Sequence, residues 1–255
     1  MSRLEAEAGT GLRDGFWTHF LPCLPAFLDR RCSACNNSFS AKKSSGVLCP
    51  ECVQKLTPPE YGFCKLCGLP FADGSTSLGP CQACLMKKPD WGSIYFLGSY
   101  QELLQELILG LKFHSALFAA PLFGSLLAKH IRAKAGHSYD LIVPVPLHPR
   151  RLKERGYNQS LELARPIAKR LAVTLEADLL LRTKYSLPQA QLNQTERLKA
   201  VKGAFAVKRR LSGEKLLLVD DVMTTGATIT ECVFCLLKAG AEAVDVALVA
   251  RTGLK

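Results

Sequence analysis

The sequence contains no long hydrophobic run. No apolar stretch of the 255-residue chain reaches the ~18 residues that a transmembrane helix needs, so we expect no membrane-spanning segment. Residues 15–28 (GFWTHFLPCLPAFL) are interrupted by His19 and two prolines, and neither a basic leader nor a small-residue cleavage site frames them. They therefore do not resemble a secretory signal. We expect a cytoplasmic protein whose residues 1–30 form an amphipathic lead-in; the alternative for this segment is a weak membrane or partner contact.

Two common phosphate-binding motifs are also missing. Neither GxxxxGKS/T nor GxGxxG occurs anywhere in the chain. These motifs hold the phosphates of nucleoside triphosphates and of dinucleotides on backbone amides. Their absence argues against a P-loop or a dinucleotide-binding fold, and any phosphate ligand must be held by a different loop.

Acidic residues are too few to balance the basic ones, and most of the imbalance lies in the longer, C-terminal part of the chain. The net charge is +11, and residues 1–90 hold 10 Lys and Arg against 8 Asp and Glu, whereas residues 91–255 hold 23 against 14. This surplus favours an anionic partner for the second part: a phosphorylated ligand, nucleic acid, or both. The alternative is a basic surface that is merely solvated.

Cysteine, in contrast, is abundant and regularly spaced. Eight of the eleven cysteines form four CxxC pairs. The pairs make two copies of the pattern C-x2-C-x13-C-x2-C, offset by 32 residues, and the same offset places Phe39 on Phe71. The chain therefore contains a duplicated unit. The paired cysteines are Cys32, Cys35, Cys49, Cys52, Cys64, Cys67, Cys81 and Cys84.

This spacing predicts two structural zinc sites. Two thiolates three positions apart can hold one side of a tetrahedral ion, and a second pair completes a four-thiolate site. Segments this short bury little apolar surface, so metal binding would supply most of their folding free energy. Sequential pairing follows from the repeat; spacing leaves a crossed arrangement open, and disulfides or redox pairs are the alternative to zinc. We expect Cys23, Cys232 and Cys235 to be small buried apolar residues.

The rest of the chain has the pattern of an α/β domain. Charge, proline and glycine in residues 87–93 (KKPDWGS) mark a boundary between a double zinc ribbon at 31–88 and a second domain at 89–255. There, strand-like segments alternate with segments of helical periodicity, which predicts a parallel sheet flanked by helices. The expected strands are 94–100, 139–144, 215–221 and 243–252, and the expected helices are 101–114, 116–136, 158–172 and 228–240.

Residues 216–230 (LLLVDDVMTTGATIT) place two carboxylates and a small-hydroxyl loop at the end of a predicted strand. Parallel sheets bind ligands beyond the carboxyl ends of their strands. The loop offers backbone amides and Thr hydroxyls to a phosphate, whereas Asp220 and Asp221 only accept hydrogen bonds and so suit ribose hydroxyls. We interpret the stretch as a ribose-5-phosphate cradle. A receiver-type acidic pair fits poorly because only 34 residues follow Asp221, and an ordinary strand–turn–helix is the remaining alternative.

These residues resemble known families. VDDVMTTGAT is similar to the signature of type I phosphoribosyltransferases, which bind phosphoribosyl pyrophosphate with Mg²⁺. The four-cysteine repeats together with three further segments resemble the ComF family, which includes proteins needed for DNA uptake in natural transformation. The resemblance runs from about residue 20 to the C-terminus, and its three further segments are LKFH (111–114), PVPLHPRRLKERGYNQS (144–160) and PQAQLNQTERLKAVKGAF (188–205).

The resemblance implies a role for each part of the predicted site. Asp220 and Asp221 would hold the ribose hydroxyls, and Lys112 is a candidate further anion contact. The 5′-phosphate loop would be Met223, Thr224, Thr225, Gly226, Ala227 and Thr228. The pyrophosphate loop would be Val145, Pro146, Leu147 and His148, followed by Arg150, Arg151, Lys153 and Arg155. This basic run suits a diphosphate or a nucleic-acid backbone, and its alternative is a solvated basic loop.

Two positions depart from the family pattern. Ala200 stands before Val201 where the family has Asn, and His114 stands where a small residue or Arg is expected.

Two functions follow. One is a phosphoribosyl-pyrophosphate-binding protein that handles DNA during uptake, with single-stranded DNA and other uptake proteins as partners. The other is an active phosphoribosyltransferase with an unidentified acceptor. The ribbons carry few aromatics for stacking on bases, so DNA binding and protein docking both remain open for them.

Overall fold

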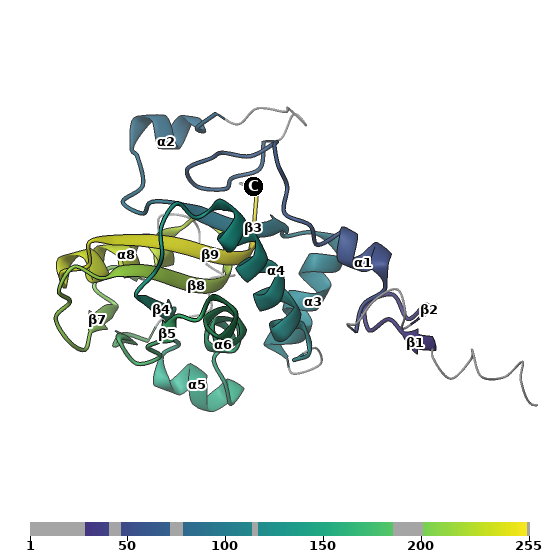
Figure 1. Cartoon of the computed structure of the whole chain (residues 1–255). Coiled ribbons are helices and arrows are strands. Elements are labelled where there is room, and N and C mark those ends of the chain that lie inside the picture. The colour runs from purple at the N-terminus through teal and green to yellow at the C-terminus, as the bar shows by residue number, and fades with distance from the viewer. Residues whose placement is uncertain (1–28, 41–46, 72–78, 114–116, 186–200, 254–255) are drawn as a thin grey trace, which may run out of the picture. The chain divides into compact units, whose positions relative to one another are not determined.

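The computed structural model describes residues 29–40, 47–71, 79–113, 117–185 and 201–253 (Figure 1). The chain divides into two compact units, residues 1–50 and 51–255, which are described separately below. Most of the predicted lead-in, together with Cys23, His114 and Ala200, lies outside the described residues. The expected boundary between residues 88 and 89 stays a prediction.

The first unit contains a small hairpin around the first CxxC pair. Strand β1 (Asp29–Arg31) pairs antiparallel with β2 (Ser38–Ser40). Between them the chain turns sharply: the Cys32 amide donates to Asn37 O at 2.9 Å, and the Asn36 amide donates to Cys32 O at 2.8 Å. Two CxxC cysteines, Cys32 and Cys35, are thereby held on one tight knuckle.

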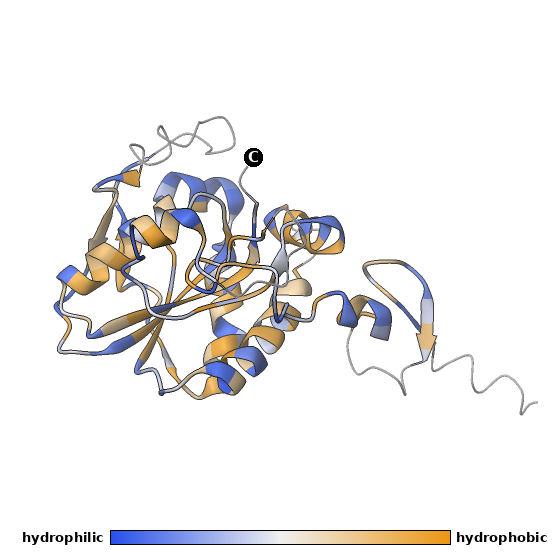
Figure 2. Cartoon of the chain, turned by 90° about the horizontal axis from the view of Figure 1, so that it is seen from above, coloured by the Kyte–Doolittle hydropathy of each residue, from blue (hydrophilic) through white to orange (hydrophobic). Residues whose placement is uncertain are grey.

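The second unit is built on a five-stranded parallel sheet, as the alternation of strands and helices predicted. The strands lie in the order β3 (Ile94–Ser99), β9 (Ala243–Arg251), β8 (Lys215–Met223), β4 (Leu141–Pro144) and β5 (Thr174–Leu175). The central strands are mostly apolar because both of their faces are covered; the exceptions inside them are Asp220 and Asp221 in β8 and Asp245 in β9. Figure 2 shows hydrophobic residues along the strands, and around them helices with one hydrophobic and one hydrophilic side.

Helices cover both faces of this sheet. Helices α4 (Ala119–Lys134) and α6 (Gln159–Leu171) contact the sheet together and pack on each other, and α8 (Ala227–Lys238) contacts β8 and β9. Helix α6 passes through Pro166 without interruption, and a Cβ on Gly124 of α4 would lie only 2.3 Å from Pro166 Cγ. The absence of a side chain at residue 124 therefore sets how closely α4 and α6 approach.

The second ribbon packs on the α8 side of the sheet. It contains α2 (Gln82–Met86), and α1 (Pro50–Gln54) precedes it in the chain. The Trp91 indole donates to Leu66 O at 2.8 Å, and the Phe63 and Phe96 rings meet edge to face at 5.0 Å. Cys64, Cys67 and Cys84 lie in the same hydrophobic cluster as the inner residues of β8 and α8. The metal-binding end of this ribbon is thus part of the core of the second unit.

Two further helices and a short strand pair complete the second unit. Helix α3 (Glu102–Lys112) follows β3, and α5 (Pro149–Arg155) follows β4. Strands β6 (Leu180–Arg182) and β7 (Phe205–Val207) form a small antiparallel pair. Among the described residues, no helix has the length and apolar character that crossing a membrane requires.

Candidate functional site

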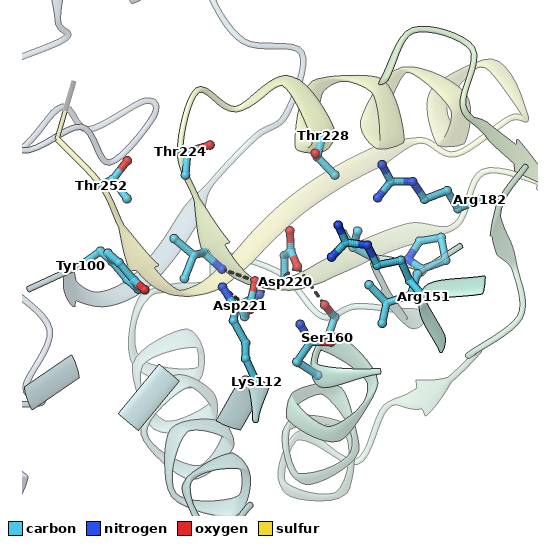
Figure 3. Close-up of a pocket in the computed structure, with 15 residues that line it drawn as sticks. Tyr100, Lys112, Arg151, Ser160, Arg182, Asp220, Asp221, Thr224, Thr228 and Thr252 are labelled. Carbon is cyan, nitrogen blue, oxygen red and sulfur yellow. Dashed lines mark hydrogen bonds and ion pairs between the residues drawn. The ribbon is translucent and has the colours of Figure 1, made fainter. Parts of the chain in front are cut away.

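A cavity of about 400 Å³ lies at the carboxyl ends of β4 and β8, where a parallel sheet is expected to bind its ligand. It brings together many of the residues predicted from sequence, which come from α3, the β4–α5 loop, α5, β8 and the start of α8 (Figure 3). The predicted residues that line it are Lys112, Val145, Pro146, Leu147, Arg151, Asp220, Asp221, Thr224 and Thr228. Met223, Thr225, Gly226, Ala227, His148, Arg150, Lys153 and Arg155 are not part of its lining.

The two aspartates lie within β8, because this strand continues to Met223, two residues beyond the expected end. Asp220 Oδ1 accepts a hydrogen bond from Ser160 Oγ at 2.8 Å and one from the Asp221 amide at 2.9 Å. Asp221 Oδ1 accepts from the Val222 amide at 2.7 Å, and its Oδ2 lies 3.1 Å from Lys112 Nζ. Both carboxylates are therefore held in fixed orientations at the floor of the cavity.

Burial makes this carboxylate pair costly to ionise fully. Desolvation raises the pKa of Asp220 to about 7, and the adjacent charge of Asp221 acts in the same direction. The Ser160 hydroxyl and the Lys112 ammonium group oppose this rise without cancelling it. At neutral pH the site consequently favours a proton, a cation or a hydroxyl donor beside Asp220.

The predicted phosphate loop joins β8 to α8. Gly226 is the N-cap of α8 and has φ 84°, a left-handed conformation that side-chain-bearing residues adopt rarely. The first amides of a helix have no intrahelical acceptor, so they are available to an anion. The loop backbone is held from below by Arg251 at the end of β9, whose guanidinium donates to Met223 O at 3.0 Å and to Thr224 O.

The predicted pyrophosphate loop is tied to the same strand. The Val145 amide donates to Val219 O at 2.9 Å, and Asn158 Nδ2 donates to Val145 O at 3.0 Å. His148 is the N-cap of α5 and accepts a hydrogen bond from the Arg150 amide at 3.2 Å. This cap starts a helix in the basic segment, and Arg151 on that helix lines the cavity.

A second cavity of about 280 Å³ adjoins the first, because Lys112 and Arg151 line both. Glu154, Arg155 and the exposed ring of Phe113 also line it. On the same helix, α5, the Arg150 guanidinium lies 4.9 Å from the centre of the Tyr185 ring, and Arg150 Nε lies 3.5 Å from Glu154 Oε1. We call this surface the basic shelf, defined by Lys112, Phe113, Arg150, Arg151, Arg155 and Tyr185.

Sequence reasoning missed several residues of the main cavity. Ser160 and Gln159 come from the first turn of α6, inside the RGYNQS segment that marks the family, which was the available signal. Arg182, on β6, points toward Asp220 in Figure 3. Its guanidinium carbon lies 5.5 Å from the centre of the Phe205 ring. Tyr100 follows the edge strand β3 and Thr252 follows β9, and nothing in their local sequence distinguishes them. The residues that complete the cavity lining are Tyr100, Gln159, Ser160, Arg182, Val222 and Thr252.

The eight paired cysteines form two clusters with sequential pairing, as the repeat predicted. Within each group of four, the sulfur atoms all lie within 4.8 Å of one another: Cys32, Cys35, Cys49 and Cys52 in the first, Cys64, Cys67, Cys81 and Cys84 in the second. Crossed pairing is excluded for these residues.

The donor geometry fits zinc. The Sγ–Sγ distances are 3.7 Å for Cys35 and Cys49 and 3.7 Å for Cys67 and Cys81. A tetrahedral ion with Zn–S bonds of about 2.3 Å separates its sulfurs by about 3.8 Å. Burial raises the pKa of the Cys64 thiol, but amides that donate to its sulfur, including Cys81 N at 3.2 Å, outweigh burial and lower the pKa to about 7. Burial raises the pKa of the Cys67 thiol to about 11, so the fit to zinc rests on geometry: each cluster can place four sulfur atoms around one structural ion.

Comparison with known proteins places both parts of the chain. A family model described as a phosphoribosyl transferase domain matches residues 157–254, and one described as a double zinc ribbon domain matches residues 23–85. DNA utilization protein YhgH of Escherichia coli (strain K12) is 34% identical over 209 residues, which cover 80% of this chain and 90% of that protein.

Two further proteins are similar to parts of the chain. Competence protein F of Haemophilus influenzae is 30% identical over 227 residues, or 86% of this chain and 96% of that protein. Among solved structures, glutamine phosphoribosylpyrophosphate amidotransferase from B. subtilis is similar with a TM-score of 0.39 and 21% identity, over 55% of this chain and 30% of that chain.

Proposed function

The chain belongs to the ComF family, with competence protein F and DNA utilization protein YhgH as relatives, and we propose that it binds phosphoribosyl pyrophosphate with Mg²⁺ in the cavity beside Asp220 and Asp221. The observation that carries this proposal is the distribution of charge around the end of β8. Two carboxylates lie at the centre, a helix N-terminus with Thr hydroxyls lies on one side, and Lys112 and Arg151 lie on the other.

Each part of the ligand matches one part of this arrangement. The ribose hydroxyls donate to Asp220 and Asp221, which accept hydrogen bonds and repel phosphate. The 5′-phosphate occupies the loop Met223–Thr228 at the start of α8. The diphosphate lies between the Val145–His148 loop and the cations Lys112 and Arg151. Magnesium, when bound, would neutralise the diphosphate oxygens. Lys112 and Arg151 would orient the diphosphate.

We further propose that the protein handles single-stranded DNA in the cytoplasm during its uptake or use. The names of the relatives support a role connected with DNA. The basic shelf combines three arginines and a lysine with the rings of Phe113 and Tyr185, which are 71% and 39% exposed. Cations that track a backbone and rings that stack on bases are what an unspecific single-strand site needs. We therefore favour the basic shelf over the ribbons as the DNA-binding surface, and we assign the first ribbon to contacts with other uptake proteins.

Phosphoribosyl transfer to an unidentified acceptor is the second candidate. It is supported by one observation: Lys112 and Arg151 line the cavity, and in this proposal they would stabilise the negative charge that develops on departing pyrophosphate. The two candidates differ in turnover.

Calorimetric titration with phosphoribosyl pyrophosphate, with and without Mg²⁺ and with pyrophosphate release followed in parallel, tests both candidates. Magnesium-dependent binding without release supports the handling function, and release supports transfer or hydrolysis. The double variant Asp220→Asn with Asp221→Asn should lose binding and keep its zinc content. Asp178→Asn, an exposed aspartate outside the cavity lining, is the matched control and should bind normally. Absence of binding by the unaltered protein would refute the proposal.

A further inference from the structure

Arg251 joins two segments that are far apart in the sequence. It is the last residue of β9 and is 3% exposed. Its Nε donates to Cys67 O at 3.1 Å, and its Nη1 donates to Met223 O at 3.0 Å, to Thr252 O at 2.8 Å and to Thr224 O. One buried guanidinium therefore holds both a knuckle of the second cysteine cluster and the start of the phosphate loop.

Apolar packing reinforces this connection. Cys67, Trp91, Met223 and Ala227 belong to one buried cluster. The Trp91 ring lies beside Gly226, where an added Cβ would meet Trp91 Cη2 at 3.9 Å, and the Trp91 indole is anchored to Leu66 O on the knuckle. The knuckle thus supports the loop from beneath through both a charged and an apolar contact.

The position of Cys67 O depends on how its knuckle is closed. The Gly68 amide donates to Cys64 O at 2.8 Å and the Cys64 amide donates to Leu69 O at 2.8 Å, which folds the chain back on itself between two metal-ligand positions. A bound ion fixes Cys64 and Cys67 together, whereas four close thiols without an ion are held only by weak hydrogen bonds to sulfur. Opening of the knuckle would remove one acceptor of Arg251, and a buried guanidinium that loses a partner must move or draw in water.

We propose that Arg251 is a positioning residue that couples zinc at the second cluster to the phosphate loop, so that the loop binds a sugar 5-phosphate tightly only while this cluster holds its ion. The ligand assignment rests on the function proposed above; the mechanical coupling rests on the contacts of Arg251. Coupling of this kind is reciprocal, so a phosphate in the loop also stabilises the zinc-loaded knuckle.

The pyrophosphate side of the cavity supplies an internal control. Among the described residues, the hydrogen bonds of Arg251 go to Cys67, Met223, Thr224 and Thr252, and none goes to the Val145–His148 loop. Loss of Arg251 should therefore weaken binding at one end of the cavity only. General damage to the fold would weaken both ends.

The binding test compares Arg251→Lys with Arg209→Lys, an exposed arginine that pairs with Glu176 and Glu214. Lysine keeps the charge but cannot donate from separate nitrogens to both segments. Calorimetry with ribose 5-phosphate should show about a tenfold loss for Arg251→Lys, while Mg²⁺–pyrophosphate binds within about twofold of the unaltered protein. Arg209→Lys should change neither affinity. Equal loss of both ligands by Arg251→Lys, or loss of neither, would overturn the coupling.

Hydrogen exchange tests the coupling without any ligand. Amides 223–228 should exchange faster in Arg251→Lys, at unchanged zinc content, and faster in Cys84→Ser than in Cys49→Ser, which removes a ligand of the first cluster. Unchanged exchange of these amides in Arg251→Lys and Cys84→Ser would overturn the coupling. If the unaltered protein binds neither ribose 5-phosphate nor phosphoribosyl pyrophosphate, the proposed function fails, and the exchange result still decides whether Arg251 couples the two segments.

Discussion

Replacing Asp220 by Asn should stabilise the ligand-free protein above neutral pH, although it removes a predicted ligand contact. Burial and the charge of Asp221 raise the pKa of Asp220 to about 7 from an ordinary value of 3.8. An acid whose pKa is raised by folding holds a proton in the native state that the unfolded chain has released. The contribution of Asp220 to the free energy of unfolding is therefore fully present below pH ~4 and is lost as the pH rises toward 7.

The size of the effect follows from this shift. A rise of about three pKa units corresponds to about 4 kcal/mol at most, since each unit is worth about 1.4 kcal/mol. Asp220 and Asp221 titrate together, and Lys112 offsets part of their repulsion, so we expect about 1–3 kcal/mol. An Asn carbonyl can still accept the hydrogen bonds that the Ser160 hydroxyl and the Asp221 amide donate to Oδ1. The variant thus removes the charge and keeps the geometry.

Urea unfolding of zinc-loaded protein between pH 5.5 and 8, without Mg²⁺ or phosphate, measures this effect. The stabilities of Asp220→Asn and unaltered protein should diverge as pH rises, with the variant more stable at pH 8. The exposed-site control Asp178→Asn should follow the unaltered protein at every pH. A variant that is less stable than the unaltered protein at pH 8, with an unchanged dependence on urea concentration, would show that the Asp220 charge is favourably solvated in its site.

Three other substitutions test separate parts of the structure. Arg155→Gln on the basic shelf should lower the slope of single-stranded DNA affinity against log salt by about 0.7, measured by fluorescence anisotropy, whereas Arg209→Gln should leave the slope unchanged. Cys49→Ser should lose about one equivalent of zinc by metal analysis and retain the other; loss of both ions would contradict independent clusters. Gly124→Ala should cost at least about 2 kcal/mol in urea unfolding because its Cβ would collide with Pro166, and Pro166→Ala should recover part of that loss; a neutral Gly124→Ala would refute the close approach of α4 and α6.

Local patterns in the sequence predicted the elements with strong, regular signals. The buried runs in β8 and β9 and the helical periodicity of α3, α4, α6 and α8 placed these elements within a few residues of their observed ends. The cysteine spacing predicted both clusters because ligand identity and spacing are fixed by one ion. Helix α5 was missed, since its seven residues contain four basic side chains and almost no apolar period, and its start depends on a His148 cap and on Pro149.

Contacts between distant segments were beyond the reach of local patterns. Ser160 meets Asp220 across 60 residues, and Arg251 meets Cys67 across 184. A serine in the first turn of a helix and an arginine at the end of a strand are ordinary in sequence, and only the order of strands in the sheet brings them to the site. The turn of α5 likewise separates the predicted basic run, because Arg151 lines both cavities and Arg155 lines the adjoining one alone.

The separation between Cys67 and Arg251 also sets an order of events during synthesis. The second ribbon leaves the ribosome early and can close its knuckles as soon as it acquires zinc, because its ligands span only residues 64–84. The surface on which it packs includes β9, the last strand of the chain. Contacts this distant in sequence form slowly, and apolar surface that waits for its partner is prone to aggregation. Docking of the ribbon on the complete sheet therefore requires β9, and until that strand has been made the apolar side of the ribbon lacks part of the surface that covers it.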